Sequence, residues 1–277
     1  MSQIMFSIIV VSLNPGEKLL ETVKSVEKQT CRDYEVIIKD GGSKDASLTM
    51  LQQYMQTSKV LSERVRLYET PDKSIYDGMN QAVSYAGGAY LYFLNCGDTF
   101  HDAEVLARIK EAVTQTDYTE GKDKIFYGDI YDMLQNTVVF SNPRIDAFAC
   151  YRNVPCHQAC FYGANLFQER GYKTWYRVRG DYEHFLWCFF EKKAQPVYTA
   201  TVIADYEGGG YSETAENVKR SKQEHKEITA LYMSRGQRAY YRFLLLITLS
   251  PVRTWMAHNP LFSKFYNKIK ELIYRKK

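Results

Sequence analysis

Asp98 lies directly after an apolar segment that ends abruptly. Residues 90–94 are apolar and aromatic, with the length of a short buried strand, and Gly97 allows a tight turn before the carboxylate. In an open parallel α/β sheet, ligands bind outside the carboxyl ends of the strands, so Asp98 is placed where a ligand would bind. Mg²⁺ is commonly held by one or two carboxylates together with substrate phosphates. The pattern therefore indicates a metal ligand, and the alternative is a carboxylate that caps a helix beginning near Asp102.

A second carboxylate, Asp40, ends the apolar segment 34–39 and precedes Gly41, Gly42 and Ser43. A carboxylate at this position can accept a hydrogen bond from a base N–H or a ribose hydroxyl, as the acid after the second strand of a dinucleotide-binding fold does. The segment is not a phosphate loop, because GxxxxGK(S/T) is absent, and GxGxxG is absent after the first apolar segment. These absences argue against classical NAD binding and against P-loop nucleotide hydrolysis.

A third carboxylate, Asp181, opens the helical segment 182–190. Aspartate is favoured at helix N-caps, where it is worth about 1 kcal/mol. A carboxylate at a helix start can also take a proton as a general base. From the residues alone, the N-cap is the favoured interpretation of Asp181.

Other polar residues could contact a phosphate-bearing ligand. His157 follows the irregular segment 141–156 and could contact a diphosphate or an acceptor, or be a half-buried ring beside a strand. Lys39 and Lys73 could neutralise phosphate, although most lysines are simply solvated. The glycine-rich segment 208–212 could close over a diphosphate with its backbone N–H groups, or be an ordinary flexible turn.

The elements that must position these residues alternate between strand and helix in the first half of the chain. The apolar patterns predict strands at 6–13, 34–39, 66–69 and 90–94, and helices at 17–29, 45–55 and 75–86, the second capped by Ser43 or Asp45. This order predicts an α/β fold with a mostly parallel sheet and helices on both faces.

The second half of the chain is less regular. We expect a hairpin from strands 125–130 and 137–140, strands at 158–162 and 197–203, a helix at 182–190, and a polar helix at 213–232 that leaves the body of the protein. The boundary near Ser212 divides the chain into a catalytic domain, 1–212, and a helical tail, 213–277.

Composition and cysteine usage are those of an ordinary globular protein. The 277 residues are 45% hydrophobic and 25% charged, so disorder is not expected. The six cysteines form no CxxC pair and no zinc-like spacing, and the apolar start, 4–13, fits a first strand better than a secretion signal. A reducing cytoplasm is the simplest interpretation.

The tail carries most of the positive charge. Residues 228–277 contain ten Lys and Arg against a single acid, Glu271, a net charge of +9 in a chain whose total is +4. Residues 243–249 are apolar but far shorter than the ~20 residues of a spanning helix. Apolar residues recur at helical spacing over 261–273 with lysines between them, which predicts a helix lying in an anionic membrane interface. The alternative is a helix docked on the body or pairing two subunits of a homodimer.

Several motifs, in this order, resemble family 2 glycosyltransferases of the bacterial type that makes colanic acid and O-antigen. They are the segments 7–14 and 36–45, the segment 72–82 (DKSIYDGMNQA), Asn95-Cys96-Gly97-Asp98, His157-Gln158, Gly180-Asp181-Tyr182, and Gly208 to Ser212. The resemblance covers roughly residues 4–214. It implies a GT-A fold, a nucleotide-diphospho-sugar donor, a divalent metal (Mn²⁺ or Mg²⁺) and inversion at the anomeric carbon.

The resemblance also implies roles for individual residues. Asp40 matches the residue that holds the uracil, Asp98 the metal ligand, and Asp181 the base. The remaining matched positions are expected to bind the donor: Ser12, Asn14, Gly41, Lys73, Asn80, Asn95, Gly97, His157, Tyr211 and Ser212. Two positions depart from the family pattern, because Asn95 replaces the first acid of the metal motif and Gly180 replaces the Glu before the base.

The sequence therefore predicts an inverting, metal-dependent glycosyltransferase of the hexosyltransferase type. The expected donor is a UDP-sugar, and the expected acceptor is a lipid-linked glycan at the inner face of the cell membrane. No nucleic-acid partner is expected. A nucleotidyltransferase is one alternative, but it would need a glycine-rich basic loop where Asn14-Pro15-Gly16-Glu17 stands. A sugar-nucleotide-binding protein without transferase activity is the other, and it leaves Asp98 and Asp181 without a role.

Overall fold

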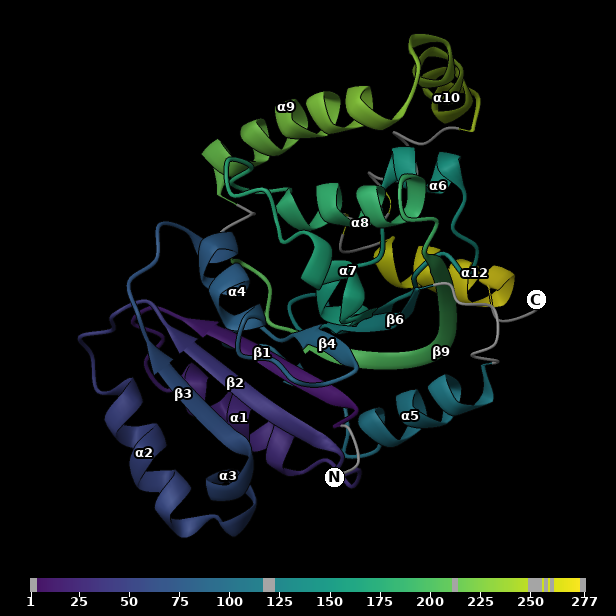
Figure 1. Cartoon of the computed structure of the whole chain (residues 1–277). Coiled ribbons are helices and arrows are strands. Elements are labelled where there is room, and N and C mark those ends of the chain that lie inside the picture. The colour runs from purple at the N-terminus through teal and green to yellow at the C-terminus, as the bar shows by residue number, and fades with distance from the viewer. Residues whose placement is uncertain are drawn as a thin grey trace.

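The computed structural model describes residues 4–116, 123–210, 214–248, 256, 259 and 262–274. In the first half, strands and helices alternate (Figure 1): β1 (Phe6–Ser12), α1 (Lys18–Glu27), β2 (Tyr34–Asp40), α2 (Ser47–Thr57), α3 (Lys59–Arg64), β3 (Val65–Glu69), α4 (Ile75–Val83) and β4 (Tyr90–Phe93). There follow β5 (Thr99–Phe100), α5 (Val105–Gln115), β6 (Lys124–Asp132), β7 (Thr137–Val139), α6 (Ala147–Arg152), the 3₁₀ turn η2 (His157–Ala159), β8 (Cys160–Gly163), α7 (Asn165–Glu169), α8 (Gly180–Phe190) and β9 (Gln195–Tyr206). Among the described residues after β9, the helices are α9 (Ala215–Tyr232), α10 (Arg235–Ile247) and α12 (Ser263–Tyr274).

The strands form one mixed sheet in the order β3-β2-β1-β4-β8-β6-β9-β5, with β7 paired to β6. β3, β2, β1 and β4 are parallel, β8 runs antiparallel to both β4 and β6, and β6 and β9 are parallel to each other. From β1 the chain builds outward through β2 and β3, and then returns to the other side of β1 with β4. This reversal is the point at which open α/β sheets bind ligands, at the carboxyl ends of β1 and β4.

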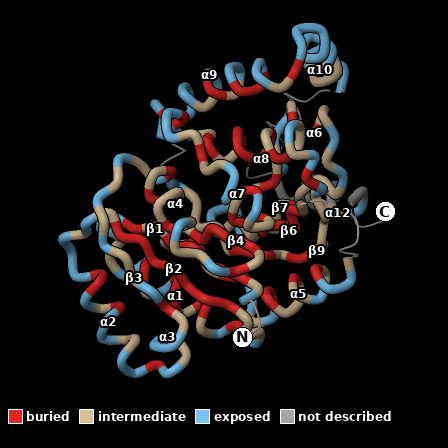
Figure 2. Tube along the Cα trace, in the orientation of Figure 1, coloured by how far each residue is buried: buried red, intermediate tan, exposed pale blue. Residues whose placement is uncertain are grey.

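Two cores hold helices to the two faces of the sheet. Because successive side chains of a strand point to opposite faces, Ile8 and Val10 of β1 lie in one core and Ile9 lies in the other. Helices α1, α2, α3 and α5 cover the first face, and α4, α7 and α8 cover the second (Figure 1). Figure 2 shows the buried residues concentrated along the central strands. A strand that is buried on both faces consists of consecutive apolar residues, so the sequence alone predicts the central strands.

Several local predictions need correction. The segment 141–156, expected to be irregular, contains α6, which Asp146 caps by accepting a hydrogen bond from the Ala149 N–H. The strand expected from residue 158 begins at Cys160, after η2. The two-residue strand β5 and the short α3 are too brief to show a periodic pattern, and β5 exists because it pairs with β9. The N-cap position of α2 is Ala46 and not Ser43 or Asp45, and Ser43 bonds to Asp40 instead. Asp45 nevertheless accepts a hydrogen bond from the N–H of Ser47, the first residue of α2, at 3.2 Å.

The helix predicted to leave the body, α9, packs on it. Ile228 is fully buried in the second core, and the carboxylate of Glu224 is buried against the loop before α8. Glu224 accepts hydrogen bonds from the backbone N–H groups of Arg177, Val178 and Arg179, at 2.8–3.0 Å. The helix looks polar in sequence because a buried carboxylate, and not an apolar stripe alone, anchors it.

The last two helices differ in their surroundings. α10 packs against α9 and α6, and its Tyr241 ring lies 5.5 Å from the rings of Phe148 and Tyr151 of α6. α12 lies against β7. Within the described part of the chain, no helix has the length and apolar character required to cross a membrane.

Candidate active site

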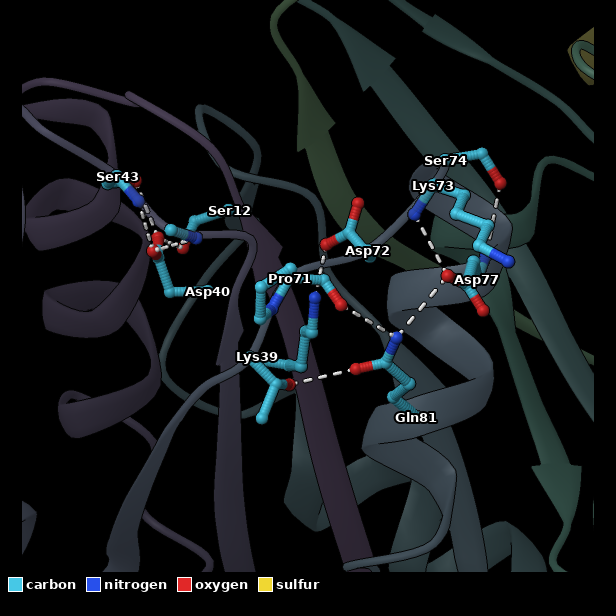
Figure 3. A network of polar contacts seen from close by, with 12 residues as sticks. Ser12, Lys39, Asp40, Ser43, Pro71, Asp72, Lys73, Ser74, Asp77 and Gln81 are labelled. Atoms are coloured by element: carbon cyan, nitrogen blue, oxygen red, sulfur yellow. Dashed lines mark hydrogen bonds and ion pairs between the residues drawn. The ribbon is translucent and has the colours of Figure 1, made fainter.

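Asp40 ends β2 in a dense set of hydrogen bonds (Figure 3). Its Oδ1 accepts from the N–H groups of Gly42 and Ser43, and its Oδ2 accepts from the hydroxyls of Ser12 and Ser43, all at 2.6–2.8 Å. Burial raises the pKa of Asp40, but these four hydrogen bonds lower it by more than burial raises it. The pKa is therefore below its ordinary value, and the carboxylate is ionised. Because a carboxylate has about four acceptor positions, a base N–H could bind Asp40 only by sharing or replacing one of these donors.

The ends of β1 and β2 are tied together by backbone and side-chain contacts. The Gly41 N–H donates to the Ser12 carbonyl at 2.8 Å. Asn14, with a left-handed φ of 48°, donates its N–H to the Ser43 hydroxyl and accepts from the Lys44 N–H through Oδ1. The predicted donor-binding residues of these two strands therefore do lie together, in a preformed arrangement.

Lys39 is not available to a phosphate. It is fully buried, and its Nζ forms an ion pair with Asp72 (Figure 3). Asp72 fits closely between two glycines, since a Cβ at Gly41 would lie 2.8 Å from its Oδ2 and a Cβ at Gly78 would lie 3.2 Å from it. The phosphate role suggested for Lys39 is therefore wrong. Lys73 is exposed, and its backbone N–H donates to Asp77 at 2.9 Å.

Asp98 is fixed by three elements that come from distant parts of the chain. Its Oδ1 accepts from the Glu207 N–H, just after β9, at 2.9 Å, and its Oδ2 accepts from Gln158 Nε2, in η2, at 2.8 Å. Its backbone carbonyl accepts from the Thr22 hydroxyl of α1. Burial raises the pKa of Asp98, and the two hydrogen bonds to its side chain only partly oppose this. Asp98 does not cap α5, which begins at Val105 after Glu104.

Gly97 is required by its backbone and by its neighbours. Its φ of +99° is one that side chains disfavour, and a Cβ there would lie 2.3 Å from the carboxylate of Glu207. Lys18 holds that carboxylate from α1, with Nζ 2.6 Å from Glu207 Oε1. The turn that presents Asp98 therefore depends on glycine.

Asn95, His157 and Asp181 form a connected chain. Asn95 Nδ2 lies 3.2 Å from His157 Nε2, and His157 Nδ1 lies 3.4 Å from Asp181 Oδ2. The Tyr76 hydroxyl, on α4, lies 2.9 Å from both Asp181 Oδ1 and the Val178 carbonyl. The end of β4, η2, α4 and the start of α8 thus meet at one carboxylate.

The environment of Asp181 favours an ionised base over a helix cap. Burial raises the pKa of Asp181, but His157 and Tyr76 lower it by more, so the group is a carboxylate at neutral pH. The side chain keeps 25% of its surface exposed, so a ligand hydroxyl can reach it. α8 has Arg179 as its N-cap and no side-chain cap. Gly180 replaces the family's Glu because a Cβ there would lie 2.8 Å from the ring of Tyr76.

Asn95 and Asp98 suit a hard divalent cation. Each oxygen of Asp98 accepts one hydrogen bond and can accept another. Asn95 Oδ1 is buried without a hydrogen-bond partner among the described residues. Such an acceptor costs about 1–3 kcal/mol, which a cation would offset. The described residues contain no group of three His, Cys, Asp or Glu side chains placed to hold a metal. Two oxygen ligands are nevertheless enough where substrate phosphates supply the others.

Not every predicted residue contributes a free group. Asn80 holds the backbone of Tyr172, donating to its carbonyl at 2.8 Å and accepting from its N–H at 2.7 Å. We therefore expect Asn80 to position the loop before α8, in place of the predicted contact with the donor. Tyr211 and Ser212 lie outside the described residues.

Three residues of this site do not stand out in the sequence. In the sequence, Tyr76 is indistinguishable from an apolar residue of a helix, and Glu207 from an ordinary surface acid. Gln158 attracts notice only as the neighbour of His157. Their contacts are with residues more than 50 positions away in the chain. The signal that could have found Tyr76 is Gly180, whose missing side chain leaves room for a ring.

Comparison with known proteins identifies the family of the chain. Residues 7–172 match the model of glycosyl transferase family 2. The chain belongs to this family. It is 34% identical over 212 residues to a PGL/p-HBAD biosynthesis glycosyltransferase of Mycobacterium bovis, an alignment that covers 76% of this chain and 80% of that relative. Family 2 membership makes the chain a glycosyltransferase.

Solved structures of low sequence identity share the fold. S. aureus TarS superposes with a TM-score of 0.61 at 15% identity over 87% of this chain, which spans 43% of the TarS chain. A shorter form of TarS has been solved with UDP. The mannosyltransferase PcManGT of Pyrobaculum calidifontis, solved with GDP-Man and Mn²⁺, has a TM-score of 0.55 at 14% identity and covers 98% of this chain and 88% of its own. The glycosyltransferase described here has the GT-A fold that its sequence predicts.

Proposed function

We propose that this glycosyltransferase inverts the anomeric carbon and uses a divalent metal to transfer a sugar from UDP to a glycan acceptor. One observation carries the proposal: an ionised, partly exposed carboxylate, Asp181, is connected through His157 to Asn95, three residues before Asp98. The proposed base and the candidate diphosphate site are thus linked at the same end of the sheet. An inverting transfer needs a base near the anomeric carbon, because the acceptor hydroxyl that attacks opposite the leaving group must lose its proton.

The chemistry assigned to Asp181 is proton removal. The acceptor hydroxyl oxygen bonds to the anomeric carbon as the bond from that carbon to the diphosphate oxygen breaks, and the hydroxyl proton passes to Asp181. A base in this position contributes about 10²–10⁴-fold to a rate. His157 and Tyr76 orient the carboxylate, and the burial of its surroundings strengthens their hydrogen bonds.

Asp98 and Asn95 Oδ1 are the residues that would hold the metal. Bound there, Mn²⁺ or Mg²⁺ would neutralise the negative charge that develops on the departing nucleoside diphosphate. The protein's own contribution is to fix Asp98 through Gln158 and Glu207 and to leave Asn95 Oδ1 unpartnered. On the opposite side of the switch point, Ser12, Asn14, Asp40 and Gly41 form the part that would receive the nucleoside. The UDP seen in a TarS structure supports this choice of nucleotide.

The decisive experiment is a donor survey. The purified protein, with and without Mn²⁺, is incubated with UDP-, GDP- and dTDP-linked sugars, and slow release of the nucleoside diphosphate is measured. We expect Mn²⁺-dependent hydrolysis of a UDP-sugar above all others. Preference for a GDP-sugar would overturn the nucleotide assignment. Release of nucleoside diphosphate that is unchanged when the metal is removed by a chelator would overturn the metal assignment. Release of pyrophosphate from a sugar nucleotide would instead support a nucleotidyltransferase.

The acceptor is proposed to be lipid-linked and met at an anionic membrane, with the enzyme peripheral at its cytoplasmic face. Support comes from α10, where Tyr240, Phe243, Leu246 and Ile247 are each 57–59% exposed. Arg235 and Arg242 lie on the same helix, and residues 228–248 contain no acid. An apolar stripe edged by arginines is typical of helices that lie in a membrane interface. On α12, Phe265 and Leu272 are exposed as well.

A further inference from the structure

Asp40 has no acceptor position left for a nucleobase. Its carboxylate oxygens already accept four hydrogen bonds, from Ser12, Gly42 and Ser43, and the residue is fully buried. A carboxylate has about four acceptor positions, so all of them are occupied. Asp40 therefore shapes the ends of β1 and β2, and a uracil bound there needs another group to accept its N–H.

Asp72 offers the free acceptor that Asp40 lacks. It lies between β3 and α4, next to Gly41 at the end of β2, and its Oδ2 forms the ion pair with the buried Lys39. Among the described residues no group donates a hydrogen bond to Oδ1, and Figure 3 shows this oxygen turned away from Lys39. The side chain keeps 16% of its surface exposed, and Oδ1 is not among the unpartnered polar atoms that are buried. A ligand can therefore reach Oδ1.

The segment that carries Asp72 is held on both sides. The Thr70 N–H donates to the Asp40 carbonyl at 3.0 Å, and the Thr70 hydroxyl donates to Gln81 Oε1, on α4, at 2.8 Å. A buried ammonium is costly unless it is paired, so Lys39 holds Asp72 Oδ2 in place. The direction of Oδ1 is thus fixed before a ligand binds.

An apolar side chain lies beside the same carboxylate. A Cβ placed on Gly41 would lie 2.8 Å from Asp72 Oδ2 and 3.5 Å from Leu13 Cδ1, so the two side chains flank one point. Leu13 follows β1 and is 59% exposed. Apolar surface combined with a small number of fixed polar groups is typical of sites for small ligands. Here that combination suits an aromatic base that carries an N–H.

We propose that Asp72, held by Lys39, accepts the N3–H of the donor's uracil, and that Asp40 builds the site without contacting the base. This inference rests on the function proposed above, since it takes a uridine nucleotide as the donor. Uracil presents one N–H between two carbonyl oxygens, so a bond to Oδ1 brings a carbonyl towards Oδ2. Lys39 neutralises Oδ2 and offsets that repulsion. Guanine presents two adjacent N–H donors, which a carboxylate with both oxygens free would suit better.

The test exchanges the free acceptor for a donor. In Asp72→Asn the amide oxygen faces Lys39, because an ammonium only donates, and the amide nitrogen takes the place of Oδ1. Cytosine carries an acceptor at N3, where uracil carries a donor. We expect the preference for UDP over CDP, the ratio of their dissociation constants, to fall by about 10–100-fold, the scale of one hydrogen bond to a charged group. Calorimetry of the full-length protein with Mn²⁺ and each nucleotide measures this ratio.

The ratio separates recognition of the base from a structural role. UDP and CDP share their ribose and diphosphate, so a residue that only supports the fold would weaken both alike. Asp40→Asn is the test of the alternative acceptor, and we expect it to weaken both nucleotides and to leave their ratio unchanged. The matched control is Asp77→Asn, from the segment just after Asp72, where Asp77 accepts from the Lys73 N–H at 2.9 Å. Its ratio should equal that of the wild type.

A double variant guards against a fold defect. Asp72→Asn leaves the ammonium of Lys39 buried without a charged partner, which costs stability. Lys39→Met with Asp72→Leu removes both charges, and replacing a buried ion pair by apolar groups of similar size is often neutral. We expect this variant to keep a Tm close to that of the wild type and to bind UDP and CDP with little preference between them.

The outcomes separate this inference from the proposed function. If the wild type prefers UDP to CDP and both Asp72 variants keep that preference, the UDP assignment stands and this inference fails. A change of the ratio in Asp40→Asn alone would assign the base to Asp40. A wild type that binds UDP and CDP equally would overturn this inference too. If the wild type binds GDP more tightly than UDP, the proposed nucleotide fails, and this inference fails with it.

Discussion

To act as the proposed base, Asp181 must stay ionised in a partly buried position, and its neighbours offset the cost of burying that charge. Desolvation alone would raise the pKa of the carboxylate and protonate part of it, and the contacts from His157 and Tyr76 lower the pKa again. A protonated Asp181 could not accept a proton from an acceptor hydroxyl. Each neighbour therefore stabilises the charged form that the proposed reaction requires.

The residue-scale prediction for the base is that Asp181→Asn removes transfer and spares donor binding. We expect turnover to fall by about 10²–10⁴-fold, because the amide cannot take the proton, with little change in UDP affinity. Initial-rate kinetics and calorimetry with UDP check this. A variant that binds UDP poorly but turns over normally at saturation would make Asp181 a structural residue of α8.

The prediction for Asp98 concerns the metal. Asp98→Asn keeps the size of the side chain, so the fold should persist, but the carboxylate proposed to bind the metal is lost. We expect the Mn²⁺-dependent part of UDP binding to disappear, by calorimetry with and without Mn²⁺. Asp102→Asn is the control, because Asp102 is exposed and paired with Arg108 at 2.7 Å, away from the site. Unchanged Mn²⁺-dependent binding in Asp98→Asn would remove Asp98 from the metal site.

At the scale of elements, α8 is held by a buried ion cluster as well as by its apolar face. Glu183 is fully buried, with Arg170 Nη2 at 2.7 Å, Lys173 Nζ at 2.8 Å and the Tyr232 hydroxyl of α9 at 2.5 Å. Burial raises the pKa of Glu183, and these three donors together lower it below its ordinary value. The helix that carries Asp181 is thus joined to α9 and to the loop after α7.

This cluster makes stability depend on pH at the acid end. The pKa of Glu183 is lower in the folded state than in the unfolded chain, so its contribution is complete above the ordinary glutamate range and is lost as pH falls through the folded pKa. We expect Glu183→Gln to cost about 1–3 kcal/mol at pH 7, and less below pH ~4, where the carboxyl of the unfolded wild-type chain takes up a proton. Urea unfolding at both pH values is the measurement. An equal loss at pH 7 and at pH 3.5 would show that charge is not the cause.

The predictability of the elements follows from how each is stabilised. β1, β2 and β4 were predictable because both of their faces are buried. A strand of this kind consists largely of consecutive apolar residues, which are visible in the sequence. β5 and α3 were not, because tertiary pairing and chain reversal define them and neither is long enough for a periodic signal. The three carboxylates of the site were found from their places after strands and before a helix. Tyr76, Gln158 and Glu207 were missed because only the fold brings them to Asp181 and Asp98.

At the scale of the whole molecule, charge and apolar exposure are concentrated in the last helices. The exposed stripe of α10 and the basic tail leave one end of the chain suited to an anionic surface. We expect the protein to bind vesicles that contain anionic lipid and to release them as salt rises, since exposed charges are screened.

The matching variant is Phe243→Ser with Ile247→Ser. Both side chains are more than half exposed, so the fold should tolerate the change, while membrane affinity should fall by about 10-fold or more for each large apolar group lost. Co-sedimentation with anionic vesicles is the measurement, and hydrolysis of the UDP-sugar should be unaffected. Val218→Ser, on the exposed side of α9, is the control. If the double variant binds vesicles like the wild type, or the wild type ignores them at low salt, the face has another role.

The three backbone bonds that Glu224 accepts have a consequence for protein engineering. They join α9 to residues 177–179, the segment that leads directly into Gly180 and Asp181. A fragment cut near Ser212 would lose this support, and Asp181, the proposed base, would no longer be held next to His157. Chimeras that exchange tails between family members should therefore be joined after Met233, which is buried. This junction keeps α9 with residues 177–179, and the exchanged part begins with α10.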